Sequence, residues 1–199
     1  MIHYEYENNC LKQGYKFIAG IDEVGRGPLA GPVVAGAVIL PGYISQIDDS
    51  KKLLPTKRAN LAKIIKAGAV DYGIGSASVE EIDQMGLQQA SYLAFRRAIE
   101  KLKKVDYLLI DGLKWKDAPL SSLAIINGDA ISCSVAAASI IAKVYRDNLM
   151  CELHKKMPDY RFDLHKGYGT KLHLELLERF GISEHHRKSF APIKRFLNI

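Results

Sequence analysis

The chain has 199 residues, of which 48% are hydrophobic and 25% charged, and its formal net charge is +6. This length suffices for one domain with a buried core, or at most for two small domains. The modest basic excess suits an anionic partner such as nucleic acid. No apolar run approaches transmembrane length, and the charged N-terminus lacks the apolar core of a signal peptide, so we expect a soluble protein without a membrane span.

The cysteines indicate a reducing environment. Cys10, Cys133 and Cys151 are odd in number and never form a C-x-x-C motif. Secreted domains usually pair their cysteines in disulfides, so we expect these residues to be free thiols. The expected location is therefore the cytoplasm, and we expect the protein to act as a monomer.

Residues 17–40 predict two strands joined by a glycine-rich turn. The apolar run Phe17–Ile21 is followed by Asp22 and Glu23, and a second apolar run spans Val33–Leu40. Side chains alternate between the faces of a strand, so the two carboxylates need not point the same way. Carboxylates at the end of an apolar strand are unfavourable unless a positive charge meets them, and a divalent cation is the obvious candidate.

The turn itself contains Gly25, Arg26 and Gly27. An acidic surface hairpin would explain the neighbouring carboxylates, because acidic turn residues are common. The turn favours a ligand site instead, since glycines let a backbone approach a ligand closely and an arginine between them suits phosphate. The turn also fits the loose dinucleotide-binding pattern G-x-G-x-x-A, but that pattern needs a helix at the glycines, which Pro28 and Pro32 interrupt.

A loop at 42–52 and a helix from Pro55 to about Gly68 come next. Residues 50–66 include six basic residues and no acidic one. A solvated helix face and a phosphate-binding edge explain this charge equally well. Lys51, which lies between Ser50 and Lys52 in the loop, is the stronger candidate for a phosphate contact, because a hydroxyl and two ammonium groups together can bind one phosphate.

Three further strands and an interrupted helix are expected over residues 69–126. They are a glycine-rich strand near an edge at 69–77, a helix at 79–103 that breaks at Gly86, an apolar strand at 105–110, and a short strand at 123–126. The last two strands deliver Asp111 and Asp129 to their carboxyl ends, which repeats the arrangement of the first strand.

A long helix is expected from about Ser134 to Met157. Its start is small and apolar, so that part should pack closely against the sheet. Ser139, Lys143 and Asp147 are spaced i, i+4 and i+8 and therefore share a face. The remaining expected segments are an aromatic and basic loop at 159–170, a helix at 170–180 that Gly181 ends, and a basic end at 182–199.

This order of elements predicts an α/β fold. The early strands should be antiparallel and the later strand–helix–strand units parallel, which makes a mixed sheet flanked by helices. If the strand ends are neighbours, the carboxylates of Asp22, Glu23, Asp111 and Asp129 converge there. Such a cluster repels itself and implies bound cations. Two divalent ions about 4 Å apart are the standard device for phosphodiester hydrolysis.

No histidine site competes well with this acidic cluster. His185 and His186 are adjacent and hence poorly placed to bind one ion together, while His154, His165 and His173 show no ligand spacing. We expect structural or surface roles for these side chains. His165 is the one histidine for which we keep a functional role open, because it lies in the aromatic and basic loop.

Seven segments in one order carry a resemblance to a known family. They are G-I-D-E-V-G-R-G-P-L-A-G-P-V at 20–33, D-S-K-K-L at 49–53, L-I-D-G at 109–112, G-D at 128–129, A-A-S-I-I-A-K-V-Y-R-D at 137–147, H-K-G-Y-G-T at 165–170 and H-R-K-S-F at 186–190. This set resembles ribonuclease HII, the type 2 ribonuclease H of bacteria, and covers nearly the whole chain.

The resemblance implies an RNase H-like fold in a single catalytic domain of residues 1–199. That fold is a mixed five-stranded sheet flanked by helices, with a helical, substrate-contacting C-terminal extension at about 160–199. The implied activity is endonucleolytic hydrolysis of RNA in RNA–DNA hybrids with Mn²⁺ or Mg²⁺, as in ribonucleotide excision repair. The family also cuts on the 5′ side of single ribonucleotides in duplex DNA, leaving 3′-hydroxyl and 5′-phosphate ends.

The resemblance also implies roles for individual residues. The family's catalytic and metal-binding carboxylates match the four side chains already selected by position, Asp22, Glu23, Asp111 and Asp129. Its ribonucleotide-sensing segment, whose backbone contacts the 2′-hydroxyl, matches Gly25, Arg26 and Gly27. Its tyrosine that stacks on the sugar of the adjoining deoxynucleotide matches Tyr168, and positions near phosphates match Lys51, Ser139 and Lys143.

The expected mechanism is in-line attack of water on the scissile phosphate, with positioning and charge neutralisation as the main sources of catalysis. Arg26 and the edge formed by Lys51 and Lys52 would hold the nucleic-acid backbone. Asp147 fits a partner of Lys143 or of Arg146 as well as it fits a catalytic residue.

Three alternatives compete with this interpretation. Ribonuclease HIII usually carries an extra N-terminal nucleic-acid-binding domain, for which 16 residues before the first strand leave no room. A non-catalytic basic nucleic-acid-binding protein would not need four acids at strand ends. Another RNase H-like nuclease or a transposase would not need the Gly-Arg-Gly turn together with Tyr168. The sequence shows no glutamine-led aromatic tail of the kind that docks on sliding clamps, so it identifies no protein partner.

Overall fold

The computed structural model describes residues 2–47, 53–112 and 114–197. The elements of the first half are α1 (Glu5–Lys12), β1 (Ile18–Val24), β2 (Val33–Ile39), α2 (Pro55–Gly68), β3 (Asp71–Ala77), α3 (Val79–Met85) and α4 (Leu87–Ile99). Those of the second half are β4 (Tyr107–Asp111), β5 (Ser122–Ile125), the 3-10 helix η1 (Gly128–Ala130), α5 (Cys133–Lys156), the 3-10 helix η2 (Pro158–Tyr160), α6 (Phe162–His165), α7 (Lys171–Phe180) and α8 (Ala191–Lys194).

The five strands form one mixed sheet in the order β3-β2-β1-β4-β5. β1 pairs with β2, and β2 with β3, in antiparallel fashion, whereas β1–β4 and β4–β5 are parallel. The predicted α/β fold with a mixed five-stranded sheet is therefore confirmed. The three parallel strands are neighbours, so their carboxyl ends, which carry the acidic residues, lie along one edge of the sheet.

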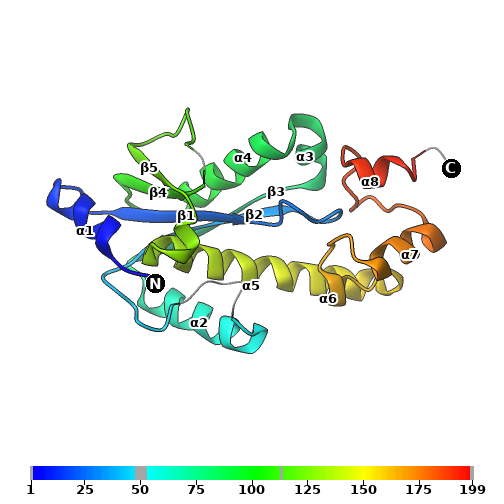
Figure 1. The fold of residues 1–199 in the computed structure, drawn as a ribbon, viewed down its shortest axis with the longest axis horizontal. Coiled ribbons are helices and arrows are strands. Elements are labelled where there is room, and N and C mark those ends of the chain that lie inside the picture. The colour runs from blue at the N-terminus through cyan, green and yellow to red at the C-terminus, as the bar shows by residue number, and fades with distance from the viewer. Residues whose placement is uncertain (1, 48–52, 113, 198–199) are drawn as a thin grey trace.

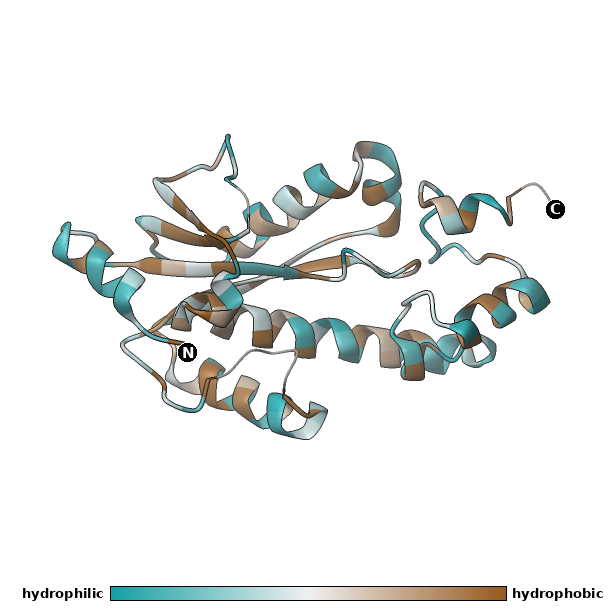
Figure 2. Ribbon diagram, viewed as in Figure 1, coloured by the Kyte–Doolittle hydropathy of each residue, from teal (hydrophilic) through white to brown (hydrophobic). Residues whose placement is uncertain are grey.

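Helices cover both faces of the sheet (Figure 1). One face packs against α4 through a core that includes Ile21, Phe95 and Trp115, and the other packs against α5 and α2 through residues such as Val38 and Ile141. Figure 2 shows hydrophobic residues concentrated on the strands and on the part of α5 beneath them. The sheet is thus the central layer of a helix–sheet–helix arrangement.

The small residues of α5 allow this helix to lie directly on the sheet, as predicted from its composition. Residues 133–142 of α5 are all buried. A Cβ atom on Gly36 of β2 would collide with the carbonyl oxygen of Ala138 and lie 3.0 Å from a side-chain carbon of Ile141. The backbone of the helix therefore occupies the space that any larger residue at position 36 would need.

Gly36→Ala is expected to destabilise the fold by about 2–3 kcal/mol, because overpacking against a backbone carbonyl forces the helix and the sheet apart. Gly68→Ala is the matched control. Gly68 is the last residue of α2, and a Cβ atom added there would meet no neighbouring atom within 4 Å, so alanine should leave stability equal or slightly higher. Urea unfolding of both variants measures the difference, and equal midpoints would contradict the close packing.

Several element boundaries differ from the predicted ones. β1 extends to Val24, so Asp22 and Glu23 lie within the strand, where the pairing with β2 continues past them. The predicted break at Gly86 is confirmed, since its φ of 80° separates α3 from α4. α4 ends at Ile99, before the predicted end at residue 103.

The polar lead-in at residues 1–16 contains a helix that the sequence did not predict. α1 carries Glu7, which is 1% exposed, to the start of α5. One carboxylate oxygen of Glu7 accepts hydrogen bonds from the Ser132 hydroxyl (2.7 Å), the Ser134 amide (2.9 Å) and the Ser134 hydroxyl (2.6 Å). A carboxylate at this place stabilises the helix, because it meets unpaired N–H groups at the positive end of the dipole.

The helical C-terminal extension is confirmed as well. η2, α6, α7 and α8 surround the far end of α5 with their own core, which contains Met150, Phe162, Leu177 and Ile193 (Figure 1). η2 and α6 occupy part of the segment predicted as a loop. Within the part of the chain that the structure describes, no helix has the length and apolar character needed to cross a membrane.

Candidate active site

The acidic residues meet where the parallel strands end. Ile21 pairs with Ile110, which sets Asp22 and Asp111 at the same level of neighbouring strands. Asp111 pairs with Ile125 of β5, and the 3-10 turn that follows β5 brings Asp129 back, so that its amide donates to Asp111 Oδ1 at 3.3 Å. The predicted convergence of these strand ends is confirmed by the strand order.

Burial and mutual repulsion perturb the acids. Burial raises the pKa of Asp22 well above its usual range, the charges of Glu23 and Asp111 raise it further, and a hydrogen bond from Ser139 opposes them. Burial also raises the pKa of Glu23, with the nearby Arg26 guanidinium as the largest opposing influence. Such a cluster favours any bound positive charge that neutralises it.

The donor set fits hard divalent cations, since carboxylate oxygens are the ligands that Mg²⁺ and Mn²⁺ prefer. Asp22 and Asp129 are only 4% and 5% exposed, which keeps water from screening them. Among residues 2–47, 53–112 and 114–197, no three acidic, histidine or cysteine side chains are already arranged as a metal cage. Glu23 is ion-paired with Arg26 at 3.3 Å in this structure.

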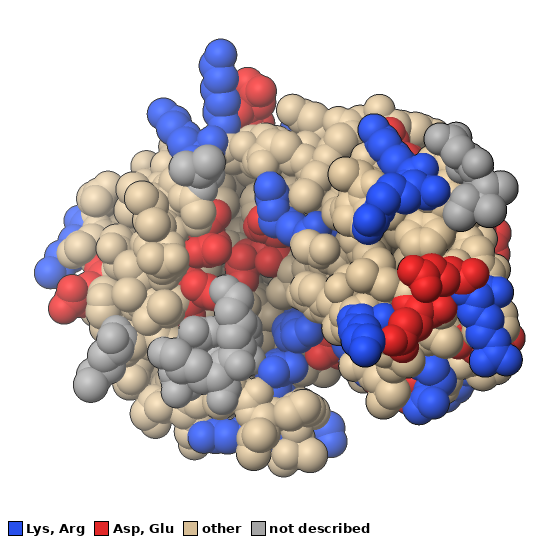
Figure 3. Space-filling view, turned by 45° about the vertical axis from the view of Figure 1, so that its right-hand side comes forward, with Lys and Arg blue, Asp and Glu red and all other residues tan. Residues whose placement is uncertain are grey.

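A cleft of about 300 Å³ opens over Asp22, Glu23 and Asp111, and Asp129 is not part of its lining. Figure 3 shows acidic side chains in a hollow on this face, with lysine and arginine side chains around it. The cleft brings together most of the predicted site residues, and its lining is Asp22, Glu23, Val24, Gly25, Arg26, Gly27, Asp111, Ser139, Lys143 and Tyr168. Lys51 lies outside the described residues.

The Gly-Arg-Gly turn rests on a buried arginine that sequence reasoning had not selected. Arg187 is 0% exposed and donates to the carbonyl oxygens of Gly25 (2.6 Å), Arg26 (3.0 Å) and Gly31 (2.8 and 2.9 Å). Burial, with a contribution from Arg146, lowers the pKa of Arg187 to about 9, which leaves it charged at neutral pH. It belongs to the H-R-K-S-F segment, but nothing in that segment showed what it binds.

A second buried arginine, Arg146 of α5, joins the turn to the C-terminal extension. It donates to the carbonyl oxygens of Pro32 (3.0 Å), Ala30 (3.1 Å) and Lys166 (3.0 Å). Its guanidinium carbon also lies 6.0 Å from the centre of the Tyr168 ring. The two arginines therefore set the position of the turn relative to Tyr168.

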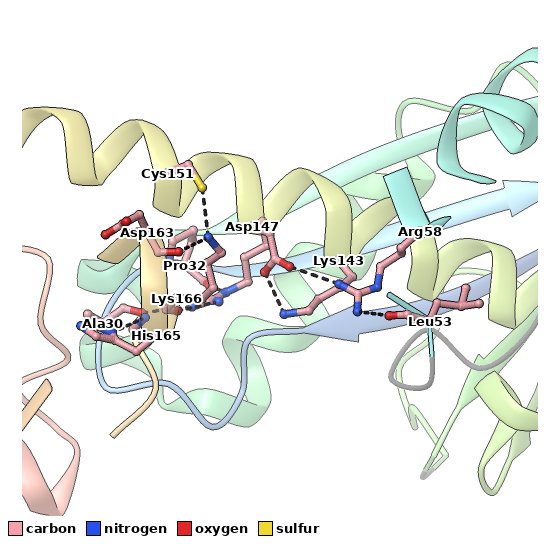
Figure 4. A network of polar contacts seen from close by, with 12 residues as sticks. Ala30, Pro32, Leu53, Arg58, Lys143, Asp147, Cys151, Asp163, His165 and Lys166 are labelled. Atoms are coloured by element: carbon pink, nitrogen blue, oxygen red, sulfur yellow. Dashed lines mark hydrogen bonds and ion pairs between the residues drawn. The ribbon is translucent and has the colours of Figure 1, made fainter. Parts of the chain in front are cut away.

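Asp147 takes the role of a partner to Lys143 rather than to Arg146. Lys143 Nζ donates to Asp147 Oδ1 at 2.7 Å, and the other carboxylate oxygen meets Arg58 at 3.4 Å (Figure 4). Arg58 also donates to the carbonyl oxygen of Leu53 at 2.8 Å. This residue of the basic run is thus buried and structural, and it ties α2 to α5.

The histidines of the C-terminal extension form a buried stack. The rings of His165 and His173 lie 4.2 Å apart, and Nε2 of His173 is 3.0 Å from Nε2 of His186. Burial lowers the pKa of His173 to about 4 and that of His186 to about 3. The predicted structural role is confirmed for these two. His165 is also structural, since it contacts Tyr160 O (2.7 Å) and the Gly167 amide (3.1 Å) and so supports the loop before Tyr168.

Comparison with known proteins identifies the family. The model of the family described as Ribonuclease HII matches residues 19–193. The chain belongs to the ribonuclease HII family. It is 52% identical to the ribonuclease HII of Chlamydia trachomatis over 95% of this chain and 88% of that protein. It is 53% identical to the ribonuclease HII of Bacillus anthracis over 96% of this chain and 75% of that protein.

Solved structures agree with this assignment. The ribonuclease H2 of Pyrococcus horikoshii superposes with a TM-score of 0.75 at 25% identity, covering 92% of this chain and 98% of that one. Bst-RNase HIII shows the same fold, with a TM-score of 0.71 at 20% identity over 92% of this chain and 69% of that one. The chain is therefore an endoribonuclease that hydrolyses RNA in RNA–DNA hybrids with divalent metal ions.

Proposed function

We propose that this member of the ribonuclease HII family cuts on the 5′ side of single ribonucleotides in duplex DNA, besides hydrolysing longer RNA–DNA hybrids. The observation that carries the proposal is that Asp22, Glu23 and Asp111 line the same cleft as the Gly-Arg-Gly turn and Tyr168. Hydrolysis and recognition of the 2′-hydroxyl would thus occur at neighbouring points. We further propose one catalytic domain, residues 1–199, that acts as a monomer in the cytoplasm, where the free Cys10, Cys133 and Cys151 suit reducing conditions.

Asp22, Glu23, Asp111 and Asp129 would hold Mn²⁺ or Mg²⁺. A structure of Bst-RNase HIII was solved in complex with Mn²⁺, which supports manganese for this fold. When bound, such ions lower the pKa of water and stabilise the leaving oxygen. The acids would contribute by orienting the ions, and the burial of Asp22 and Asp129 limits the access of bulk water to these two carboxylates.

The remaining residues would bind and orient the nucleic acid. Backbone groups of the Gly-Arg-Gly turn would contact the 2′-hydroxyl, which is the atom that separates RNA from DNA. Tyr168, which is 42% exposed, is free to stack on the next sugar. Ser139, Lys143 and Lys51 would contact phosphates, and the Asp147 carboxylate would orient the Lys143 ammonium toward them.

The decisive experiment uses a labelled DNA duplex with one internal ribonucleotide, an all-DNA duplex and a long RNA–DNA hybrid, each with Mn²⁺ or Mg²⁺. We expect cleavage 5′ of the ribonucleotide, leaving a 3′-hydroxyl, while the all-DNA duplex stays intact. Cleavage of the long hybrid alone would overturn the single-ribonucleotide proposal, although the hydrolase assignment would remain.

Tyr168→Ala is expected to reduce kcat/KM on the single-ribonucleotide duplex by about 10- to 100-fold, since stacking on one nucleotide contributes about 1–3 kcal/mol. Tyr168→Phe keeps the ring and should stay within about threefold of the wild type. The loss should be smaller on a long hybrid, where no deoxynucleotide adjoins the cut. Steady-state kinetics on both substrates measures the ratio, and an equal loss on both would contradict the stacking role.

A further inference from the structure

Arg26 is attached to helix α4 on the face of the sheet opposite α5. Its Nη1 donates to the Ser91 hydroxyl at 2.9 Å, and its Nη2 donates to the Gln88 side-chain oxygen at 3.1 Å. The same Nη1 lies 3.3 Å from Glu23 Oε1. The guanidinium therefore spans from two neutral acceptors on α4 to one of the proposed metal ligands.

Strand alternation explains why Glu23 is the acid that meets Arg26. Asp22 points toward α5, where Ser139 hydrogen-bonds to it, so Glu23 points to the opposite face, over α4. A second cavity, of about 220 Å³, lies on that side. Its lining is Glu23, Arg26, Gln88, Ser91, Tyr92, Phe95, Asp111 and Gly112. Glu23 and Arg26 also line the cleft over the acids, so they stand at the border of both spaces.

The environment of Ser91 makes its hydroxyl oxygen an acceptor for the Arg26 guanidinium. It is 1% exposed, and its hydroxyl donates to the Leu87 carbonyl oxygen at 3.0 Å. Because its one proton is used in this way, an oxygen lone pair remains for the guanidinium. A long arginine side chain is held in one geometry only if such contacts offset its lost rotamer freedom.

The positive charge of Arg26 partly neutralises the Glu23 carboxylate, as a bound divalent cation would. Glu23 is a partly buried carboxylate near other acids, and the Arg26 guanidinium forms an ion pair with it. A carboxylate that already pairs with a fixed guanidinium binds a metal ion more weakly. The guanidinium and the cation would use the same carboxylate oxygens, and their positive charges repel each other.

We propose that Ser91 and Gln88 are positioning residues that hold Arg26 as the counter-charge of Glu23, so that Arg26 competes with divalent cations for this carboxylate. This inference rests on the proposed function, because it takes Glu23 as a metal ligand. Arg26 thus stabilises the acidic cluster of the metal-free enzyme and weakens its first binding of cations.

Binding of Mn²⁺ to the full chain without nucleic acid, measured by titration calorimetry at low salt, tests the proposal. Arg26→Gln removes the charge and should lower the Kd for Mn²⁺ by about two- to fivefold, which is the scale of one ion pair whose arginine is 40% exposed. Ser91→Ala and Gln88→Ala free Arg26 from α4 and should lower the Kd by a smaller factor. Gln89→Ala, at the next position of the same helix, is the matched control and should leave the Kd unchanged, because Gln89 lines a separate pocket with Tyr92 and Trp115.

A double-variant cycle separates positioning from a general effect on the fold. In the Arg26→Gln background, Ser91→Ala should have no further effect on the Kd, because its influence passes through Arg26. An unchanged or higher Kd for Arg26→Gln would overturn the competition, and an additive effect of Ser91→Ala would overturn its positioning role. Thermal unfolding followed by circular dichroism shows that each variant is folded before its Kd is compared.

Asp22→Asn distinguishes failure of this inference from failure of the metal site. If Asp22→Asn binds Mn²⁺ as tightly as the wild type, the proposed metal site itself is wrong. If Asp22→Asn loses binding while Arg26→Gln and Ser91→Ala leave the Kd at the wild-type value, the metal site stands and only the competition by Arg26 fails.

Discussion

Asp22→Asn is expected to reduce kcat on an RNA–DNA hybrid by at least about a thousandfold, or about 4 kcal/mol of activation free energy. Asp22 is the most buried of the acids in the cleft and is surrounded by the other carboxylates. Asn keeps the shape of the side chain but removes the charge that would hold cations at the scissile phosphate. Single-turnover cleavage with Mn²⁺ measures the effect.

The same variant should remain folded and bind duplex, since the contacts of the turn and of Lys143 are unchanged. Asp159→Asn, at an exposed position of η2, is the control for the chemical change and should cleave like the wild type. Undiminished cleavage by Asp22→Asn would remove the acidic cluster from the mechanism. Loss of binding together with loss of cleavage would show that Asp22 supports the fold instead.

Thermal unfolding without metal tests independently whether the pKa of Asp22 is raised in the folded protein. Its pKa is raised in the folded state, so its charged form is unfavourable at neutral pH. This penalty begins to shrink as the pH falls to the raised pKa, and it is gone below the ordinary pKa of the unfolded chain. In EDTA at pH 7, Asp22→Asn should therefore melt at a higher temperature than the wild type, by about 2–4 °C for each kcal/mol relieved. The difference should vanish in acid.

Arg187→Ala is expected to have the largest effect on stability, a loss of about 3–5 kcal/mol. The substitution leaves a cavity and removes the hydrogen bonds to the carbonyl oxygens of Gly25, Arg26 and Gly31, all in a buried place. Most domains are stable by only about 5–15 kcal/mol, so the variant should be close to unfolding at 37 °C. Urea unfolding measures the loss.

Arg195→Ala is the matched control, because Arg195 is exposed beside α8 and its removal should change stability by less than about 0.5 kcal/mol. Arg187→Lys retains the charge but replaces the planar fork with a point charge, so it should recover only part of the loss. Full recovery by lysine would show that charge, and not hydrogen bonding to the turn, is what Arg187 supplies.

Local patterns in the sequence determined which strands and which turn form this site. Apolar runs that end in acids marked β1 and β4, and glycines with prolines marked the turn between β1 and β2. These signals are readable because strand side chains repeat every two residues, and because parallel strands deliver their carboxyl ends to one edge. The order of elements was then enough to predict the mixed sheet. It predicted the convergence of Asp22, Glu23, Asp111 and Asp129 only on the condition that their strand ends are neighbours, which the strand order of the structure decided.

Only the tertiary structure decided which side chains hold these strands and this turn in position. Arg187 and Arg146 donate to backbone carbonyl oxygens far away in the chain, as in the bond from Arg187 to Gly25, and Glu7 accepts a bond from the backbone amide of Ser134 at the start of α5. Every residue carries a backbone carbonyl and, except proline, an N–H group, so such partners leave no pattern of residue types. The attachment of Arg26 to Ser91 and Gln88 likewise depends on how α4 packs against the sheet, which side-chain periodicity alone does not specify.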